Sequence, residues 1–126
     1  MSNAFGDVGT AKYVLLTTFT KDGTPKPTPI WAVLDGDELL MWTQSKSWKV
    51  KRIRNTPRVT VATCDRSGNN AGPAMDAVAE VLDENGTTRT REKIIAKYGI
   101  PGRIAVTMSS LFKGKDSTIG LSLRAS

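Results

Sequence analysis

The sequence contains no histidine, and this absence removes many familiar enzyme mechanisms. A chain without imidazole cannot build a Ser-His-Asp or Cys-His centre, and it lacks the side chain that most often acts as a general base near neutral pH. It also lacks a common zinc ligand, and we predict no metal site. Many familiar hydrolase mechanisms are therefore excluded.

Cysteine and long apolar runs are also scarce. The single cysteine, Cys64, cannot form an internal disulfide, and the first residues do not have the charge and apolar pattern of a secretory leader. The longest apolar stretches, such as residues 14–16, are far shorter than the roughly 20 residues that a helix needs to cross a bilayer. We expect a cytoplasmic protein without a membrane span.

Positive charge is present in excess and is concentrated in one segment. The 126 residues contain 18 Lys plus Arg and 12 Asp plus Glu, which gives a net charge of +6. Residues 39–64 hold no acid and six basic residues, namely Lys46, Lys49, Lys51, Arg52, Arg54 and Arg58. This segment therefore accounts for the whole excess. A localised basic patch indicates an anionic ligand such as nucleic acid, an acidic membrane or a phosphorylated cofactor.

Short segments rich in β-branched and aromatic residues predict strands. They cover residues 13–20, 28–34, 38–43, 58–63, 75–82 and 117–123. Turns are expected at 21–25 and 35–37, and a loop at 65–73. Pro27 and Pro29 cannot donate hydrogen bonds to a neighbouring strand, so the second strand should begin at an edge or at an opening of the sheet.

Helical spacing of apolar residues appears in two places. It predicts a short helix over residues 45–55, capped by Ser45 or Ser47, and a second helix over 88–98 after a turn at Asn85-Gly86. Residues 103–113 fit either a helix or a loop. The strand spacing indicates a mainly β protein, a small antiparallel barrel with short helices that forms one domain over residues 1–126.

The first of these helices carries lysines where a helix disfavours them. Lys46 and Lys49 lie in or before its first turn, close to the unpaired N–H groups and the partial positive charge of a helix start. A phosphate bound there would accept bonds from these N–H groups, from Ser47 and from Lys49. The alternative is that the lysines only solvate an exposed helix.

Three segments in this order resemble the pyridoxamine phosphate oxidase-like flavin-binding split-barrel superfamily. They read YVLLTTFTKDGTPKPTPIW, LLMWT and SWKVKRIRNTPRVTV, and the resemblance covers about residues 11–82. Within the superfamily the chain is most similar to actinobacterial enzymes that use the deazaflavin coenzyme F420. The resemblance implies a six-stranded antiparallel Greek-key split barrel and a homodimer with cofactor sites at its interface.

The same resemblance implies roles for individual residues. Lys49 matches the lysine that holds the cofactor phosphate, Ser47 a neighbouring phosphate-side position, and Thr43 the hydroxyl residue that ends the preceding strand. The other matching positions are Pro29, Ile30 and Trp31 beside the flavin ring, and Lys51 as a further basic residue. Trp48 stands where pyridoxamine phosphate oxidases have arginine, and their C-terminal substrate residues have no match, so pyridoxamine phosphate is not the expected substrate.

The expected function is an F420-dependent oxidoreductase that transfers hydride to a small-molecule acceptor, with flavin mononucleotide (FMN) as the alternative cofactor. F420 carries a phosphate and several carboxylates, and the basic segment has more charge than one phosphate requires. The cofactor carries out the redox chemistry in such enzymes, so the sequence identifies no catalytic side chain.

Two other functions remain open. The chain could hold flavin, deazaflavin or haem on the same fold without turnover. It could also be a nucleic-acid-binding barrel, given a pI of about 9.7. We do not expect nucleic acid as a partner, because aromatic residues are few and the charge lies on one helix rather than across a sheet.

Overall fold

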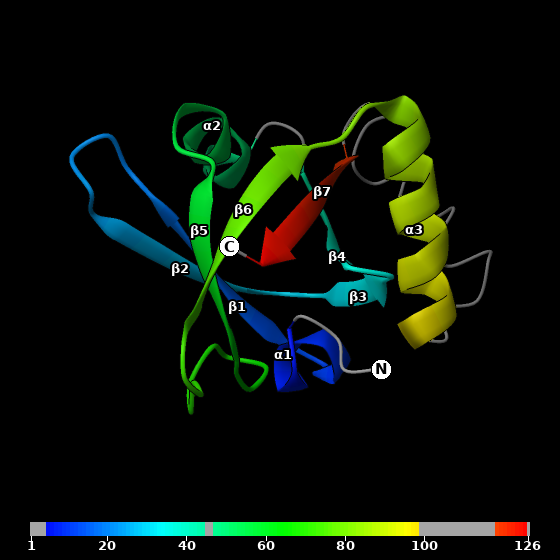
Figure 1. Ribbon diagram of the computed structural model, residues 1–126, viewed down its shortest axis with the longest axis horizontal. Coiled ribbons are helices and arrows are strands. Elements are labelled where there is room, and N and C mark those ends of the chain that lie inside the picture. Colours follow the sequence, from blue (N-terminus) through cyan, green and yellow to red (C-terminus); the bar gives the residue numbers. More distant parts are fainter. Residues whose placement is uncertain (1–4, 45–46, 99–117, 126) are drawn as a thin grey trace.

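Seven antiparallel strands form one sheet that curls around its own apolar face (Figure 1). The computed structural model describes residues 5–44, 47–98 and 118–125. The strands are β1 (Val14–Phe19), β2 (Pro25–Ile30), β3 (Ala32–Asp35), β4 (Glu38–Gln44), β5 (Arg58–Thr63), β6 (Met75–Val81) and β7 (Thr118–Ala125). Their order across the sheet is β2-β1-β5-β6-β7-β4-β3. This is the predicted split-barrel architecture.

In the described residues, three helices accompany the sheet. They are α1 (Asp7–Thr10), α2 (Trp48–Asn55) and α3 (Glu84–Tyr98). In Figure 1, α2 lies beside β6 and β1, whereas α3 runs along β7, β4 and β3 on the other side. Within the described ranges, no helix has the length and apolar character needed to cross a bilayer. The region 103–113, expected as a helix or loop, falls outside the described residues.

The strand count of six is wrong because the segment predicted as one strand over residues 28–34 is two strands. The chain leaves the sheet at Trp31, so β2 pairs with β1 at one edge and β3 pairs with β4 at the other. Prolines at alternate positions 25, 27 and 29 place their missing N–H groups along one edge of β2. This edge can therefore remain unpaired, as predicted, and Trp31 connects the two ends of the sheet.

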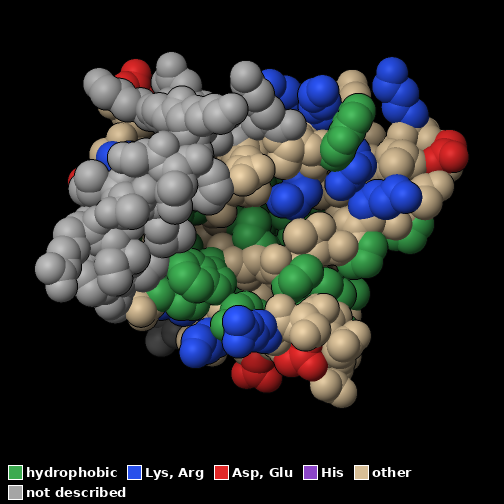
Figure 2. Space-filling model, turned by 180° about the vertical axis from the view of Figure 1, so that it is seen from behind, with side chains coloured by type: hydrophobic (Ala, Val, Ile, Leu, Met, Phe, Trp, Pro, Cys, Tyr) green, Lys and Arg blue, Asp and Glu red, His purple; other side chains and the backbone are tan. Residues whose placement is uncertain are grey.

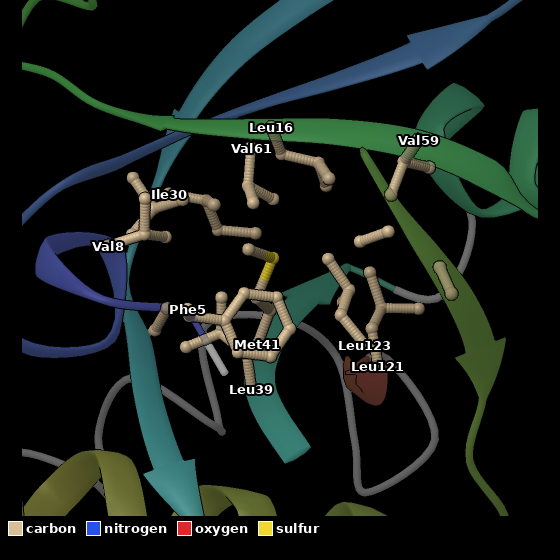
Figure 3. Close-up of a cluster of buried hydrophobic side chains, with 14 of the residues drawn as sticks. Phe5, Val8, Leu16, Ile30, Leu39, Met41, Val59, Val61, Leu121 and Leu123 are labelled. Atoms are coloured by element: carbon tan, nitrogen blue, oxygen red, sulfur yellow. The ribbon is translucent and has the colours of Figure 1, made fainter. Parts of the chain in front are cut away.

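The core lies inside the curled sheet and receives side chains from all seven strands. Figure 3 shows Leu16, Val61, Met41 and Leu123 pointing toward one another across this space. Phe5 and Val8, in and before α1, close one side of the same cluster. The strand pattern gave no indication of α1, since four residues are too few to show a period.

The turn predicted at Asn85-Gly86 is wrong, because both residues belong to the first turn of α3. The N–H of Gly86 donates to Asp83 Oδ1 at 2.8 Å, as expected of a residue that caps a helix. A Cβ atom at Gly86 would lie 2.9 Å from the Leu82 Cβ atom. Glycine is therefore present for close packing rather than for a turn.

Helix α3 packs closely on β7 at Gly120. The Gly120 N–H donates to Thr87 Oγ1 at 2.9 Å, and a Cβ atom at Gly120 would lie 2.7 Å from Thr90 Oγ1. On the solvent side, Arg89 contacts Glu38 at 2.8 Å and Asp35 at 3.5 Å. These ion pairs are exposed and contribute little energy, so apolar packing holds the helix and the charges orient it.

We expect Gly120→Ala to destabilise the fold by about 1 to 3 kcal/mol, because the added methyl group overpacks the helix–sheet contact. Urea unfolding measures the change. Thr90→Ala removes the atom closest to the new methyl group, so the cost of Gly120→Ala should be smaller in that background. An equal cost in both backgrounds would contradict this account of the contact.

Candidate functional site

A cavity of about 400 Å³ opens between the two ends of the curled sheet. This volume falls within the range of small-molecule sites. Its lining is mostly apolar and aromatic, with a few polar groups, and consists of Tyr13, Pro29, Ile30, Trp31, Trp42, Thr43, Gln44, Lys49, Arg66, Ile94 and Thr118. Lys and Arg side chains gather above a hollow with hydrophobic side chains on the face shown in Figure 2.

Five of the seven residues predicted for the site line this cavity. They are Pro29, Ile30, Trp31, Thr43 and Lys49. Ser47 and Lys51 are not part of the lining. Residues 29–31 and the end of β4 are not paired with each other. They come close because β2 pairs with β1 at one end of the sheet, β4 pairs with β7 near the other end, and the sheet curls between them.

Lys49 lies in the first turn of α2, and its side chain is half-buried at the cavity wall. Burial, and to a lesser degree the charge of Arg52, lowers the pKa of Lys49. The first turn of α2 contains no acidic residue to balance this charge. An anion in the cavity would stabilise the ammonium group and bind the free N–H groups of the helix start.

Ser47 occupies the N-cap position of α2, as one of the two predicted caps, but its hydroxyl does not cap the helix. Its Oγ atom is buried and has no hydrogen-bond partner among the described residues, and the same holds for Nε1 of Trp42. A buried polar group without a partner costs about 1 to 3 kcal/mol. Trp42 lines the cavity and Ser47 does not, so a polar ligand in the cavity that reached Nε1 of Trp42 would remove the cost at that group.

Lys51 points away from the cavity and covers Trp48. Its Nζ atom lies 4.5 Å from the centre of the Trp48 ring, and the Trp48 side chain is 69% exposed. Two residues along a helix correspond to about 200°, which places Lys49 and Lys51 on different faces of α2. The alternation of basic residues in the sequence cannot show which of them faces the site.

Trp31 forms one wall of the cavity, and α3 holds it in place. Its ring stacks on Tyr98 with a centroid separation of 4.5 Å and an interplanar angle of 10°. The Tyr98 hydroxyl accepts the N–H of Ala32 at 3.2 Å and donates to the carbonyl of Lys12 at 2.7 Å. Burial raises the pKa of Tyr98, which keeps the hydroxyl proton available for this bond.

Lys97 strengthens the same junction from the neighbouring position on α3. Its Nζ atom donates to the carbonyls of Ala11 at 2.8 Å and Ala32 at 2.6 Å. Because the chain crosses between sheet edges at this point, its backbone groups lack strand partners and depend on α3 for hydrogen bonds. The last turn of α3 therefore determines where Trp31 lies.

Sequence reasoning did not place Arg66, Gln44, Ile94 or Thr118 in the site. Arg66 lies in a loop that the composition alone described as a connection, and Ile94 is identified only as a core residue of a helix. Gln44 and Thr118 are opposite each other at the ends of β4 and β7. The only available signal was that Gln44 directly follows Thr43; the rest requires the tertiary arrangement.

The profile of the pyridoxamine 5'-phosphate oxidase family matches residues 7–115 of this sequence. The chain belongs to this family. The match spans the whole cavity lining except Thr118, and it agrees with the resemblance carried by the three sequence segments. No curated protein matches the sequence significantly.

Three solved structures illustrate the similarity of the fold. A conserved hypothetical protein of Mycobacterium tuberculosis is 23% identical with a TM-score of 0.71, over 94% of this chain and 75% of that one. The haem storage protein HutZ of Vibrio cholerae is 15% identical with a TM-score of 0.69, over 91% and 82%. An F420 reductase is 20% identical with a TM-score of 0.61, over 95% and 91%. These similarities establish the fold.

Proposed function

We propose that this chain is an oxidoreductase that binds coenzyme F420 and passes hydride to a small-molecule acceptor, with FMN as the alternative cofactor. The observation that carries the proposal is the cavity itself. Apolar and aromatic walls accommodate a flat ring. Lys49 supplies the positive charge that a phosphate needs, and the start of α2 supplies backbone N–H groups.

The residues present fit such a cofactor. Lys49 and the first N–H groups of α2 would hold the phosphate, with Ser47 at the N-cap position next to them, whereas Pro29, Ile30 and Trp31 would lie beside the ring. Bound F420 or FMN would supply the hydride chemistry, and the protein would position the ring and exclude water. We assign no side chain to proton transfer.

Charge favours F420 over FMN, since its tail carries carboxylates in addition to the phosphate. Among the described residues of the basic segment, Arg58 is paired with an acid, Asp76, at 3.7 Å, whereas Arg52 donates to the neutral Thr18 Oγ1 at 2.7 Å and keeps its charge. Similarity to an F420 reductase supports the same choice.

We further propose a homodimer with the cofactor near its interface. Light scattering of the purified protein would test whether the dimer forms.

The second candidate is a protein that holds a flavin, deazaflavin or haem without turnover, which the similarity to a haem storage protein favours. The two candidates differ in one measurement. Pre-reduced cofactor is mixed with an excess of an artificial acceptor, with and without the protein, and oxidation of the cofactor is followed. The protein should accelerate this oxidation over repeated turnovers only if the chain is an enzyme. Binding without any acceleration would favour the second candidate.

We expect F420 to bind with a micromolar or lower dissociation constant and FMN to bind more weakly. Titration of the protein into each cofactor, followed by quenching of cofactor fluorescence at two salt concentrations, measures both. The F420 affinity should fall more steeply with salt because more charge is neutralised. Tighter binding of FMN would identify a flavin enzyme, and no binding of either would reject the proposed function.

A further inference from the structure

Arg66 is the second cation at the cavity, and it comes from a different element than Lys49. It lies in the connection between β5 and β6, outside the basic segment of residues 39–64. Among the described residues that line the cavity, Lys49 and Arg66 are charged and none is acidic. Two cations at a cavity whose described lining holds no acid suit a ligand that carries more than one anionic group.

The loop that carries Arg66 is well braced. Asp65 Oδ1 accepts the N–H groups of Ser67 at 2.9 Å and Asn69 at 2.8 Å, and its Oδ2 accepts the Asn70 amide at 2.9 Å. These bonds lower the pKa of Asp65 and occupy its carboxylate with neutral donors. In the part of the chain that the structure describes, no carboxylate lies within 4.0 Å of the Arg66 guanidinium, so its charge is available to a ligand.

The same loop is in close contact with the cavity wall. Gly68 has a φ of +83°, and a Cβ atom there would lie 3.4 Å from both Leu15 Cδ1 and Pro29 Cδ. Pro29 itself lines the cavity, so the loop is seated on a wall of the cavity that Lys49 also lines. Arg66 is exposed at the mouth rather than buried within.

We propose that Arg66 binds a second anionic group of the cofactor, a carboxylate, and thereby distinguishes F420 from a ligand with phosphate alone. The inference rests on the proposed function. Half-buried Lys49 is suited to the phosphate next to the helix N–H groups. An exposed guanidinium suits a carboxylate outside the cavity, because its planar donors match two carboxylate oxygens.

The test compares Arg66→Gln with the wild type against three ligands: F420, F420 stripped of its glutamate tail, and FMN. We expect Arg66→Gln to raise the dissociation constant of F420 about three- to tenfold and that of FMN less than about twofold. The stripped cofactor shows whether Arg66 contacts the tail or a group nearer the phosphate. Arg54→Gln is the matched control, since Arg54 is exposed and does not line the cavity.

The outcomes separate this inference from the proposed function. If the wild type binds F420 and Arg66→Gln leaves that affinity unchanged, or weakens F420 and FMN equally, the role of Arg66 is overturned while the proposed function stands. If the wild type binds neither cofactor, both are rejected. Circular dichroism and thermal unfolding of Arg66→Gln establish that the variant is folded, as expected for an exposed side chain.

Discussion

Lys49→Gln is expected to weaken the binding of both F420 and FMN by about 1 to 3 kcal/mol, or roughly 5- to 150-fold. The substitution removes a charge-assisted bond to the phosphate at the start of α2, where the helix N–H groups remain. Fluorescence titration measures the change. Riboflavin, which has no phosphate, should bind the variant and the wild type equally.

The pH dependence provides a second readout at the same residue. Because burial lowers the pKa of Lys49 below its ordinary 10.5, the ammonium group loses its proton at a lower pH than in an unfolded chain. Affinity for the phosphate should therefore fall as the pH rises through that lowered pKa. Lys49→Arg stays charged to higher pH and should retain its affinity there.

Lys51→Gln is the control for Lys49, because Lys51 lies on the same helix but covers Trp48 outside the cavity. It should change the affinity for FMN by less than about twofold, as expected of an exposed charge. Unchanged FMN and F420 binding by Lys49→Gln, or an equal loss in both lysine variants, would show that the phosphate binds elsewhere.

Tyr98→Ala is expected to lower the free energy of unfolding by about 2 to 4 kcal/mol and also to weaken cofactor binding. The variant loses the stack on Trp31 and leaves the buried N–H of Ala32 without its partner. Trp31 would then no longer be held against the cavity. Urea unfolding and cofactor titration at a temperature where the variant is folded measure the two effects.

Tyr98→Phe separates the stack from the hydrogen bonds. It keeps the ring on Trp31 but removes the hydroxyl, so it should lose about 1 to 2 kcal/mol of stability. If the stack positions Trp31, Tyr98→Phe should bind cofactor almost as the wild type does. If Tyr98→Ala unfolds at the same urea concentration as the wild type, α3 does not hold the segment around Trp31 where the chain passes from β2 to β3.

Most of the strands could be predicted because their side chains alternate between core and surface. The pattern in β1 and β5 shows which residues face inward, since a half-buried strand repeats every two residues. The break at Trp31 was hidden, because β2 and β3 together read as one continuous run. Pro27 and Pro29 indicated an edge but not that the chain crosses to the opposite edge there.

The first turn of α3 could not be predicted from Asn85-Gly86 because these residues are typical of turns. The helix forms there because Asp83 caps it and because Gly86 allows close packing on Leu82. The tertiary contacts of these residues therefore favour a helix although their local preference is for a turn. The absence of a Cβ atom also allows close packing at Gly120, where a side chain would collide with Thr90 and where no sequence pattern indicated the contact.

One residue of the candidate site was visible as a local conflict in the sequence. Lysines in the first turn of a helix indicated an anion site, and Lys49 does line the cavity. The family resemblance, rather than this pattern, placed Lys51 in the site. Lys51 does not line the cavity, because helix geometry turns its side chain toward Trp48. The dimer and the choice of cofactor remain predictions.

By itself, the sequence determined the type of fold, the absence of histidine chemistry, and the location of the short helix whose first turn carries Lys49, because alternation, composition and charge are local properties. Only the tertiary structure decided that Trp31 and Tyr98 form a wall and that Arg66 stands with Lys49 at one cavity. These residues are far apart in sequence. They meet because the sheet curls and the chain crosses between its edges, and no local pattern encodes that crossing.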